Sequence, residues 1–246
     1  MSFAAGNIEF RNRFWIIGAA YGIGFFLYRF DPTNVSVALA HRILGSNISE
    51  DSAPFGHAVR ALFVFGALLV TLAAIVRSWA TAYLHANVVH DADIHSERLL
   101  ADGPYRHLRN PLYLGNILMA AGLGLLASRV GFVIIVLVNI VIVVRLIARE
   151  EAGLIASQGQ SYRRYYEAVP SLLPSFRARV PAGDGNPNWR DGFFGESFVW
   201  GFAAGMVAIA VTLSVGWFWI FAGTGFAVYF LQGYLRGREK DCALDS

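Results

Sequence analysis

Lysine, cysteine and charged residues in general are scarce in this chain of 246 residues. The single cysteine, Cys242, excludes an internal disulfide framework and a zinc site built from several cysteines. Its distance from the C-terminus does not fit a prenylation signal. Lys240 is the only lysine, so the formal net charge of +3 rests almost wholly on arginine. Only 15% of the residues are charged and 56% are hydrophobic, a balance that excludes an ordinary soluble domain and predicts an integral membrane protein.

Long apolar runs predict an all-α protein with about six transmembrane helices. The expected spans are Phe14 to Tyr28, residues 58–80, Pro111 to Ala127, Gly131 to Ile147, and two from the stretch Phe198 to Tyr234. As one helix that last stretch would be over ~50 Å long, against an apolar bilayer core of about 30 Å, so we divide it near Ser214 to Gly216. Ser128-Arg129 leaves room only for a tight turn, so the third and fourth spans should form a hairpin.

The arginines predict the orientation of these spans. With a cytoplasmic N-terminus, six spans leave only Arg29, Arg42, Arg60 and Arg129 on the outer side. The C-terminus and the main polar segments then lie in the cytoplasm, where basic residues are preferred. This arrangement explains the arginines better than nucleic-acid binding does, so we expect no nucleic-acid partner. The cytoplasmic set is Arg98, Arg106, Arg109, Arg149, Arg163, Arg164, Arg177, Arg179, Arg190, Arg236, Arg238 and Lys240.

We divide the chain into a membrane core, residues 1–196, whose motifs lie in 99–174, and a two-helix extension with a short tail, residues 197–246. The Pro-, Gly- and Asn-rich stretch PAGDGNPNW at 181–189 is typical of a flexible linker or a surface loop.

The stretch GPYRHLRNPLYLG, from Gly103 to Gly115, places three cations at the start of an apolar span. Asn110-Pro111 predicts a helix start, since Asn can cap free backbone N–H groups and Pro tolerates the first helical position. Arg106, His107 and Arg109 would surround the positive end of that helix and could bind a carboxylate or phosphate. The alternative is a basic turn that only sets membrane orientation.

Glu150-Glu151 follows the fourth span, and the hairpin should place this pair beside the cationic turn. Together they would form a mouth able to hold a zwitterion. Because two acids suit a helix C-terminus poorly, we expect the helix to continue to about Ser157, with Gly159 as its C-cap. The alternative is that the two glutamates pair with Arg145 and Arg149.

Several motifs occur together in the order of a known family. They are Gly103 with Tyr105, Arg109 through Gly115, Glu150-Glu151, Gly159 with Tyr162 and Tyr165, and Pro174. This series resembles the isoprenylcysteine carboxyl methyltransferases and the related phospholipid methyltransferases. One position departs from the family pattern, since Asn110 stands where the family has a histidine, and its amide or His107 would have to replace that ring.

The resemblance implies an S-adenosylmethionine site on the cytosolic face, formed by loops and helix ends, and a lipophilic acceptor that enters from the bilayer. Arg106 and Arg109 would bind the cofactor's carboxylate, and Glu150 and Glu151 its ammonium or ribose hydroxyls. Arg109, Glu150 and Glu151 are thus the expected catalytic residues, by positioning. The expected cofactor-binding residues are Tyr105, Arg106, His107, Arg109, Asn110, Tyr113, Gly115, Glu150, Glu151, Tyr162 and Tyr165.

The acceptor itself stays open between a carboxylate, an amine and a thiol of a lipid or prenylated molecule. A carboxylate needs no base, whereas an amine must lose a proton, for which Glu150, Glu151 or His107 are candidates. Gly122 and Gly124 are similar to a Gly-x-Gly of the phospholipid methyltransferases, although close helix packing explains them equally.

Three other interpretations compete with this one. A sterol-type reductase using NADPH has a loosely similar arginine-rich turn, and a scaffold or transporter without catalysis could keep the motif. Against transport, the spans hold few ionisable residues at mid-depth beyond Arg145. A metal site at His90, Asp91, Asp93 and His95 is conceivable, but methyl transfer needs no metal and we expect none.

Overall fold

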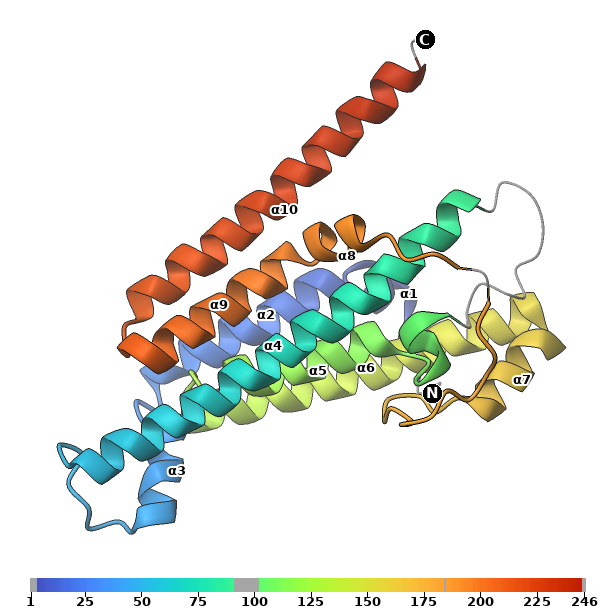
Figure 1. The fold of residues 1–246 in the computed structure, drawn as a ribbon. Helices are drawn as coiled ribbons and strands as arrows, with labels where there is room; N and C mark the ends of the chain where they lie inside the picture. Colours follow the sequence, from blue (N-terminus) through green and yellow to red (C-terminus); the bar gives the residue numbers. More distant parts are fainter. Residues whose placement is uncertain (1–3, 91–101, 184, 245–246) are drawn as a thin grey trace.

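The protein is a bundle of α-helices in the computed structural model, which describes residues 4–90, 102–183 and 185–244 (Figure 1). Within these ranges no strand forms, only an isolated bridge between Asn34 and Ser128. The all-α prediction is therefore confirmed for the described residues. The helices are α1 (Asn7–Arg11), α2 (Arg13–Phe26), η1 (Leu27–Arg29), α3 (Val35–Leu44), α4 (Ala53–His90), η2 (Gly103–Arg106), α5 (Pro111–Gly124), α6 (Arg129–Gln158), α7 (Gln160–Ala168), α8 (Trp189–Gly195), α9 (Ser197–Thr212) and α10 (Val215–Leu244).

Three of these helices are long and apolar enough to cross a membrane, namely α4, α6 and α10 over Ala53–Leu84, Arg129–Gln158 and Val215–Arg238. A fourth span results if α8 and α9, which meet at a bend of 61°, count as one. Helices α2 and α5 have 14 residues each, short of the ~20 that a bilayer core requires. The six-span count therefore stays a prediction, and three or four spans are supported.

The outer faces of the long helices are apolar. Leu68 on α4, Leu137 on α6 and Phe230 on α10 are 63%, 55% and 65% exposed, as are many neighbours of the same kind. In water such surfaces would be costly, whereas acyl chains cover them without loss. These faces, like the composition, indicate a membrane protein.

The predicted hairpin of the third and fourth spans is confirmed as α5 and α6. The chain turns at Ser128, whose hydroxyl accepts a hydrogen bond from the Gly131 N–H at 3.1 Å. Gly124 packs against the Phe132 ring across the hairpin, and a Cβ on Gly122 would lie 2.6 Å from the Val70 side chain on α4. Close packing thus accounts for both glycines.

Helix α6 runs past the glutamate pair to Gln158, and Gly159 caps it with a left-handed φ of 61°. This matches the predicted end of the helix. The division of the last apolar stretch is also confirmed, since α9 ends at Thr212 and α10 begins at Val215.

Helices α9 and α10 belong to the largest buried cluster of the bundle. Val199 and Met206 on α9 pack with Val70 on α4, Met119 on α5 and Phe218 on α10. The proposed division of the chain at residue 196 stays a prediction, and the packing shows that the last two helices share a core with α4 and α5.

Gly183, Gly185 and Asn188, three residues of the stretch 181–189, are held against the bundle by hydrogen bonds. The Asp102 carboxylate accepts hydrogen bonds from Gly183 and Gly185 N–H at 2.6 and 3.0 Å, and Asn188 N–H donates to the Ala82 carbonyl at 2.9 Å. Of the two predicted forms, linker or surface loop, the contacts fit an anchored surface loop.

The polar motifs gather at one end of the bundle. In Figure 1 the turn η2, helix α7 and the α8 end of α9 lie on one side, and α3 lies at the opposite end. A cavity lined by residues of α2, α5, α9 and α10 contains the site described next.

Candidate functional site

The turn from Gly103 to Asn110 takes its shape from one glycine and one buried carboxylate. Gly103 has a left-handed φ of 55°, and a Cβ there would collide with the Tyr83 ring. Only glycine therefore fits without strain. Asp102, just before it, is 5% exposed and fastens the surface loop as described.

A return segment, residues 169–180, fastens the same turn from the other side. Backbone N–H groups of Arg109 and Asn110 donate to the carbonyls of Pro170 and Ser171 at 2.8 and 3.1 Å. Ser175 N–H donates to the His107 carbonyl at 3.0 Å. The turn is thus held in register by main-chain bonds, which fixes the side chains that it carries.

Arg109 and Glu151 form a buried ion pair at the centre of the site. Arg109 Nε donates to Glu151 Oε1 at 2.8 Å, and the two side chains are 8% and 9% exposed. Arg109 Nη1 donates to the carbonyls of Tyr166 and Val169, each at 2.5 Å, and the guanidinium lies 4.0 Å from the Tyr166 ring centre. Five N–H groups in a planar fork allow all of these contacts at once.

Asn110 joins this pair instead of capping its helix. It occupies the N-cap position of α5, but its side chain accepts no bond from the first turn. Its amide nitrogen donates to Glu151 Oε1 at 2.9 Å and to the Ser171 hydroxyl at 3.1 Å. The interpretation of Asn110 as a side-chain cap is therefore wrong, because the carboxylate attracts the amide donor more strongly.

Glu150 faces Tyr113, whose hydroxyl donates to Glu150 Oε1 at 2.8 Å. The alternative pairing of the glutamates with Arg145 and Arg149 is wrong. Arg145 pairs with Glu9 at 2.8 Å, and Arg149 donates to the Ala5 carbonyl and the Asn7 side chain. The N-terminal segment thus occupies both arginines and leaves the glutamates to the mouth.

Three tyrosines cover the inner side of the mouth. Tyr165 donates its hydroxyl to the Tyr105 carbonyl at 2.9 Å, and Tyr162 lies beside it with ring centres 5.7 Å apart. Burial raises the pKa of Tyr162 from 10 to about 12, and raises the pKa values of Tyr105 and Tyr165 further. All three hydroxyls therefore stay protonated at neutral pH.

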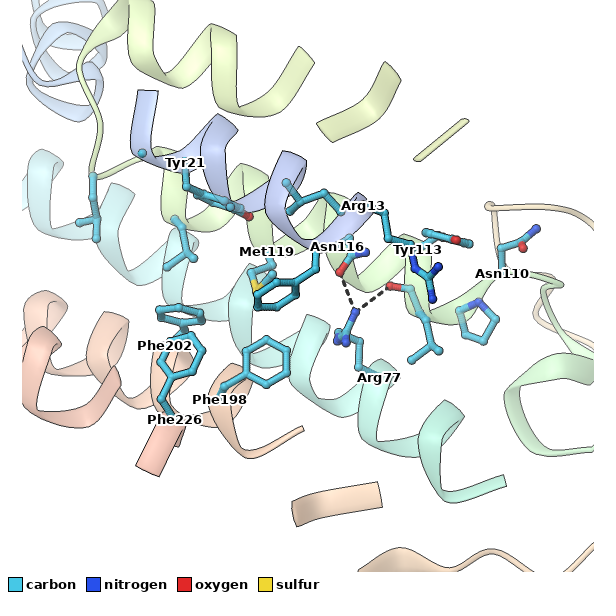
Figure 2. Close-up of a pocket in the computed structure, with 18 of the residues that line it drawn as sticks. Arg13, Tyr21, Arg77, Asn110, Tyr113, Asn116, Met119, Phe198, Phe202 and Phe226 are labelled. Atoms are coloured by element: carbon cyan, nitrogen blue, oxygen red, sulfur yellow. Dashed lines mark hydrogen bonds between the residues drawn. The ribbon is translucent and has the colours of Figure 1, made fainter. Parts of the chain in front are cut away.

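These residues line one end of a cavity of about 1310 Å³ (Figure 2). Tyr105, Arg109, Asn110, Tyr113, Glu150, Glu151, Tyr162 and Tyr165 all line it, so eight of the eleven predicted binding residues come together. From this mouth the cavity continues between α2, α5, α9 and α10 along apolar side chains. Those include Met119, Leu123, Phe198, Phe202, Phe218, Trp219 and Phe226.

Arg106, His107 and Gly115 are not among the described residues that line the cavity. Arg106 Nε donates to the Val180 carbonyl at 3.0 Å, and His107 Nδ1 lies 2.8 Å from the Ser175 carbonyl, so both hold the return segment. Gly115 lies against Arg77, where a Cβ would collide with that side chain.

Sequence reasoning missed Arg77 and Glu196. Arg77, on α4, pairs with Glu196 at 2.7 Å and also donates to Asn116 Oδ1 at 2.6 Å. Arg77 and Asn116 line the cavity, so Arg145 is not the only ionisable residue at depth in the bundle. The sequence did contain a signal for Arg77, because it is the only charged residue in the apolar run AAIVRSWATA and a buried charge requires a partner.

Arg13 was also missed as a site residue. It begins α2, lines the cavity and points toward Tyr113 (Figure 2). In the sequence it directly precedes the first expected span, Phe14 to Tyr28. It adds a second cation to the mouth beside Arg109.

The considered metal site lies mostly outside the described residues, which end at His90 and resume at residue 102. Within the described ranges no three His, Cys, Asp or Glu side chains come together as metal ligands. The mouth instead offers two carboxylates, two guanidinium groups and four tyrosines next to a mostly apolar cavity. That arrangement suits a zwitterionic ligand at the mouth and an apolar ligand beyond it.

Part of the chain matches a known protein family. Residues 61–159 match the phospholipid methyltransferase family. The phospholipid methyltransferase match contains most of α4, the turn η2, α5 and α6, and so holds Arg109, Asn110, Glu150 and Glu151. The resemblance to membrane methyltransferases is thereby confirmed over this segment, and it supports a membrane methyltransferase.

Two curated proteins are similar over part of their length. The nickel-cobalt-cadmium resistance protein NccN of Alcaligenes xylosoxydans xylosoxydans is 26% identical over 140 residues, which cover 57% of this chain and 61% of the relative. The cobalt-zinc-cadmium resistance protein CzcN of Cupriavidus metallidurans is 26% identical over 113 residues, or 46% of this chain and 49% of the relative. The chain thus spans about half to three fifths of the length of these relatives. No solved structure matches.

Proposed function

We propose that the protein is an integral membrane methyltransferase that uses S-adenosylmethionine and methylates a lipophilic acceptor. One observation carries the proposal. The hydrogen bonds that join Arg109 and Asn110 to Glu151, and Tyr113 to Glu150, lie at one end of a cavity whose remainder is mostly apolar. The phospholipid methyltransferase match over residues 61–159 supports the reaction class.

The polar groups at the mouth fit this cofactor. Glu150 and Glu151 each use one carboxylate oxygen on a partner within the described residues and can turn the other to an ammonium or to ribose hydroxyls. Arg109 and Arg13 are the cations available for the cofactor's carboxylate, and they replace Arg106 in that role because it lies away from the cavity.

The cavity has room for two ligands. Its volume of about 1310 Å³ exceeds the roughly 300–1,000 Å³ of a typical small-molecule site. A zwitterion at the mouth leaves the aromatic section for the chain of the acceptor. Burial of that chain would hold it in place without directional bonds.

The cofactor supplies a methyl group on a sulfonium sulfur. The protein's part is to align the two reactants in line and to exclude water. The buried ion pair of Arg109 and Glu151 supplies a rigid wall, and the tyrosines on α7 and η2 cover the mouth. An amine acceptor would also have to lose a proton, for which Glu150 and Glu151 are in reach of the cavity and His107 is not.

The test is binding of S-adenosylmethionine and, in parallel, NADPH to the purified protein in a nonionic detergent. We expect the first ligand to bind and the second not. Glu150→Gln should weaken S-adenosylmethionine binding at least ~10-fold, since it removes a charge but keeps an oxygen for the Tyr113 hydroxyl. The matched control is Glu167→Gln on the exposed face of α7, which should bind normally.

Other outcomes would redirect the assignment. Binding of NADPH alone would favour the reductase. Absence of both ligands from folded protein, together with solute flux in proteoliposomes, would favour a transporter and contradict the proposal.

A further inference from the structure

Polar side chains line the cavity at a second place, beyond the mouth. Arg77 on α4, Asn116 on α5 and Tyr21 on α2 face it from three different helices (Figure 2). We call these three residues the inner polar site. Because polar groups in an apolar cavity are costly without partners, their grouping requires an explanation.

The Arg77 guanidinium is fixed by hydrogen bonds from Nε and Nη1, but its remaining N–H groups are available for a ligand. Its Nε donates to Glu196 Oε2 at 2.7 Å, and its Nη1 donates to Asn116 Oδ1 at 2.6 Å and to the Leu112 carbonyl at 3.2 Å. Within the described residues, Nη2 has no hydrogen-bond partner. Glu196 is 6% exposed and also accepts the Thr81 hydroxyl at 2.7 Å, so its carboxylate offsets and orients the guanidinium.

Tyr21 supplies an independent observation. Its hydroxyl is buried and has no hydrogen-bond partner in the described part of the chain. Buried polar groups are nearly always satisfied, so an orphaned hydroxyl on a side chain that lines a cavity indicates a missing ligand atom. Asn116 adds its amide nitrogen, which is left over because its oxygen already accepts from Arg77.

The unused groups are chiefly donors. The Arg77 Nη2 and Asn116 Nδ2 groups can only donate, and the Tyr21 hydroxyl can donate. An ammonium would find no carboxylate here that is free of partners, since Glu196 is engaged by Arg77 and Thr81. A group with several acceptor oxygens matches these donors.

The inner polar site lies between the mouth and the aromatic section. Asn116 follows Asn110 by six positions, which is about 9 Å along the helix axis. In Figure 2, Phe198, Phe202 and Phe226 lie on the far side of Arg77 and Asn116, where Tyr21 also lies, and Tyr113 and Asn110 lie on the near side. A ligand whose chain fills the aromatic section would therefore place its head group at the inner polar site, next to the cofactor's end of the cavity.

We infer that Arg77, Asn116 and Tyr21 bind an oxyanion, a carboxylate or a phosphate, in the head group of the lipophilic acceptor. The inference deepens the proposed function and rests on it. Glu196 is a positioning residue that acts through Arg77. The expected acceptor is thus an anionic amphiphile, and a purely cationic amine is disfavoured.

The test uses three probes with the same chain: dodecanoate, dodecyl phosphate and dodecylammonium. Their binding to the purified protein in nonionic detergent is measured by equilibrium dialysis, without cofactor. We expect one or both oxyanions to bind at least ~10-fold more tightly than the ammonium, and the stronger of the two identifies the head group.

Tyr21→Phe is the decisive variant. It should weaken oxyanion binding about 3- to 10-fold, the effect of one lost hydrogen bond. Its thermal unfolding temperature should be unchanged or higher, because the deleted hydroxyl has no protein partner. Tyr229→Phe, the same deletion on an exposed tyrosine of α10 that does not line the cavity, should change neither property.

Equal affinity for all three probes, or normal oxyanion binding by Tyr21→Phe, would overturn the inference. S-adenosylmethionine binding is measured on the same samples. If S-adenosylmethionine binding is normal while the preference for oxyanions is absent, the inference about the inner polar site is wrong and the proposed function stands. If it is absent while Tyr21-dependent oxyanion binding persists, the proposed function fails and the binding site stands.

Discussion

At the scale of single residues, Arg109 makes the most contacts in the mouth. It donates to one carboxylate and two carbonyls and stacks on a ring, and its neighbour Asn110 shares the same carboxylate. A point charge cannot reproduce this pattern, because the contacts depend on the planar arrangement of the guanidinium N–H groups.

Arg109→Lys tests this dependence. The variant keeps the charge but loses most of the fork, and it should lower the free energy of unfolding by about 2 kcal/mol. It should also weaken S-adenosylmethionine binding. Thermal unfolding in detergent and ligand titration check both effects, with Arg163→Lys on the exposed face of α7 as control. Equal stability of the two variants would contradict the buried-fork interpretation.

Asp31 gives a prediction on pH. Hydrogen bonds from the Arg129 side chain, at 2.8 Å to Nη2, together with the Val130 N–H, hold the pKa of this carboxyl below its ordinary value of 3.8. A carboxyl with a lowered folded-state pKa stabilises the fold above its unfolded-state value, and that contribution is lost as the pH falls through the folded-state value.

Asp31→Asn should therefore unfold at a lower temperature than the wild type at pH 7. The difference should shrink as the pH falls below about 4, where the wild-type carboxyl also begins to lose its charge. Asp51→Asn, in the exposed loop before α4, serves as control. A difference that stays constant down to the acid limit would show that the ion pair is not its source.

The sequence predicted the central residues of the mouth but not the inner polar site. Glu150 and Glu151 could be placed beside the turn because a short hairpin makes the start of one helix and the end of the next neighbours. The predicted capping role of Asn110 was wrong, since an asparagine before a proline suits capping and carboxylate binding equally. Arg77 and Glu196 are 119 positions apart, so no local pattern connects them.

At the scale of helices, the crossing of α4 and α5 depends on small residues. A Cβ on Gly122 would lie 2.6 Å from Val70 Cγ2 and 2.7 Å from the Gly66 carbonyl oxygen. Two helices at this distance exclude even one extra methyl group. Because α5 carries Tyr113 of the mouth and Asn116 of the inner polar site, the crossing also sets the width of the cavity.

Gly122→Ala should accordingly lower the free energy of unfolding by roughly 1–3 kcal/mol, the usual effect of overpacking. Gly233→Ala on α10, where no atom lies within 4 Å of the added Cβ, should be neutral or stabilising because alanine favours helix. Thermal unfolding of both variants decides the matter, and similar melting temperatures would exclude a tight crossing.

Helix boundaries followed from the sequence where a local signal existed. Gly159 and the turn at Ser128 ended or began helices as expected. The spans at α2 and α5 came out shorter than the apolar runs suggested, because η1 and the turn after Gly124 end these helices early. An apolar run indicates burial or lipid contact, but it does not by itself predict the length of a helix.

At the scale of the whole molecule, the mouth and the loop between α3 and α4 lie at opposite ends of the bundle (Figure 1). The arginine distribution predicts that the mouth faces the cytoplasm. Single cysteines can test this, since the natural chain has only Cys242, which can be replaced by serine.

In that background Asn47→Cys should react with a membrane-impermeant thiol reagent in intact cells, and Arg163→Cys should react only after permeabilisation. Both side chains are exposed, so access to the reagent is set by the membrane. Labelling of Arg163→Cys alone in intact cells would invert the orientation, and labelling of both would contradict the spans between them.

The ion pair between Arg77 and Glu196 also constrains how this protein can diverge. Arg77 lies inside the segment that matches the phospholipid methyltransferase family, whereas Glu196 lies beyond it, at the start of α9. Loss of either partner would leave a buried charge without compensation, which costs several kcal/mol. Related chains should therefore change the two positions together. A chimera that takes α8 to α10 from a relative should also need that relative's residue at position 77.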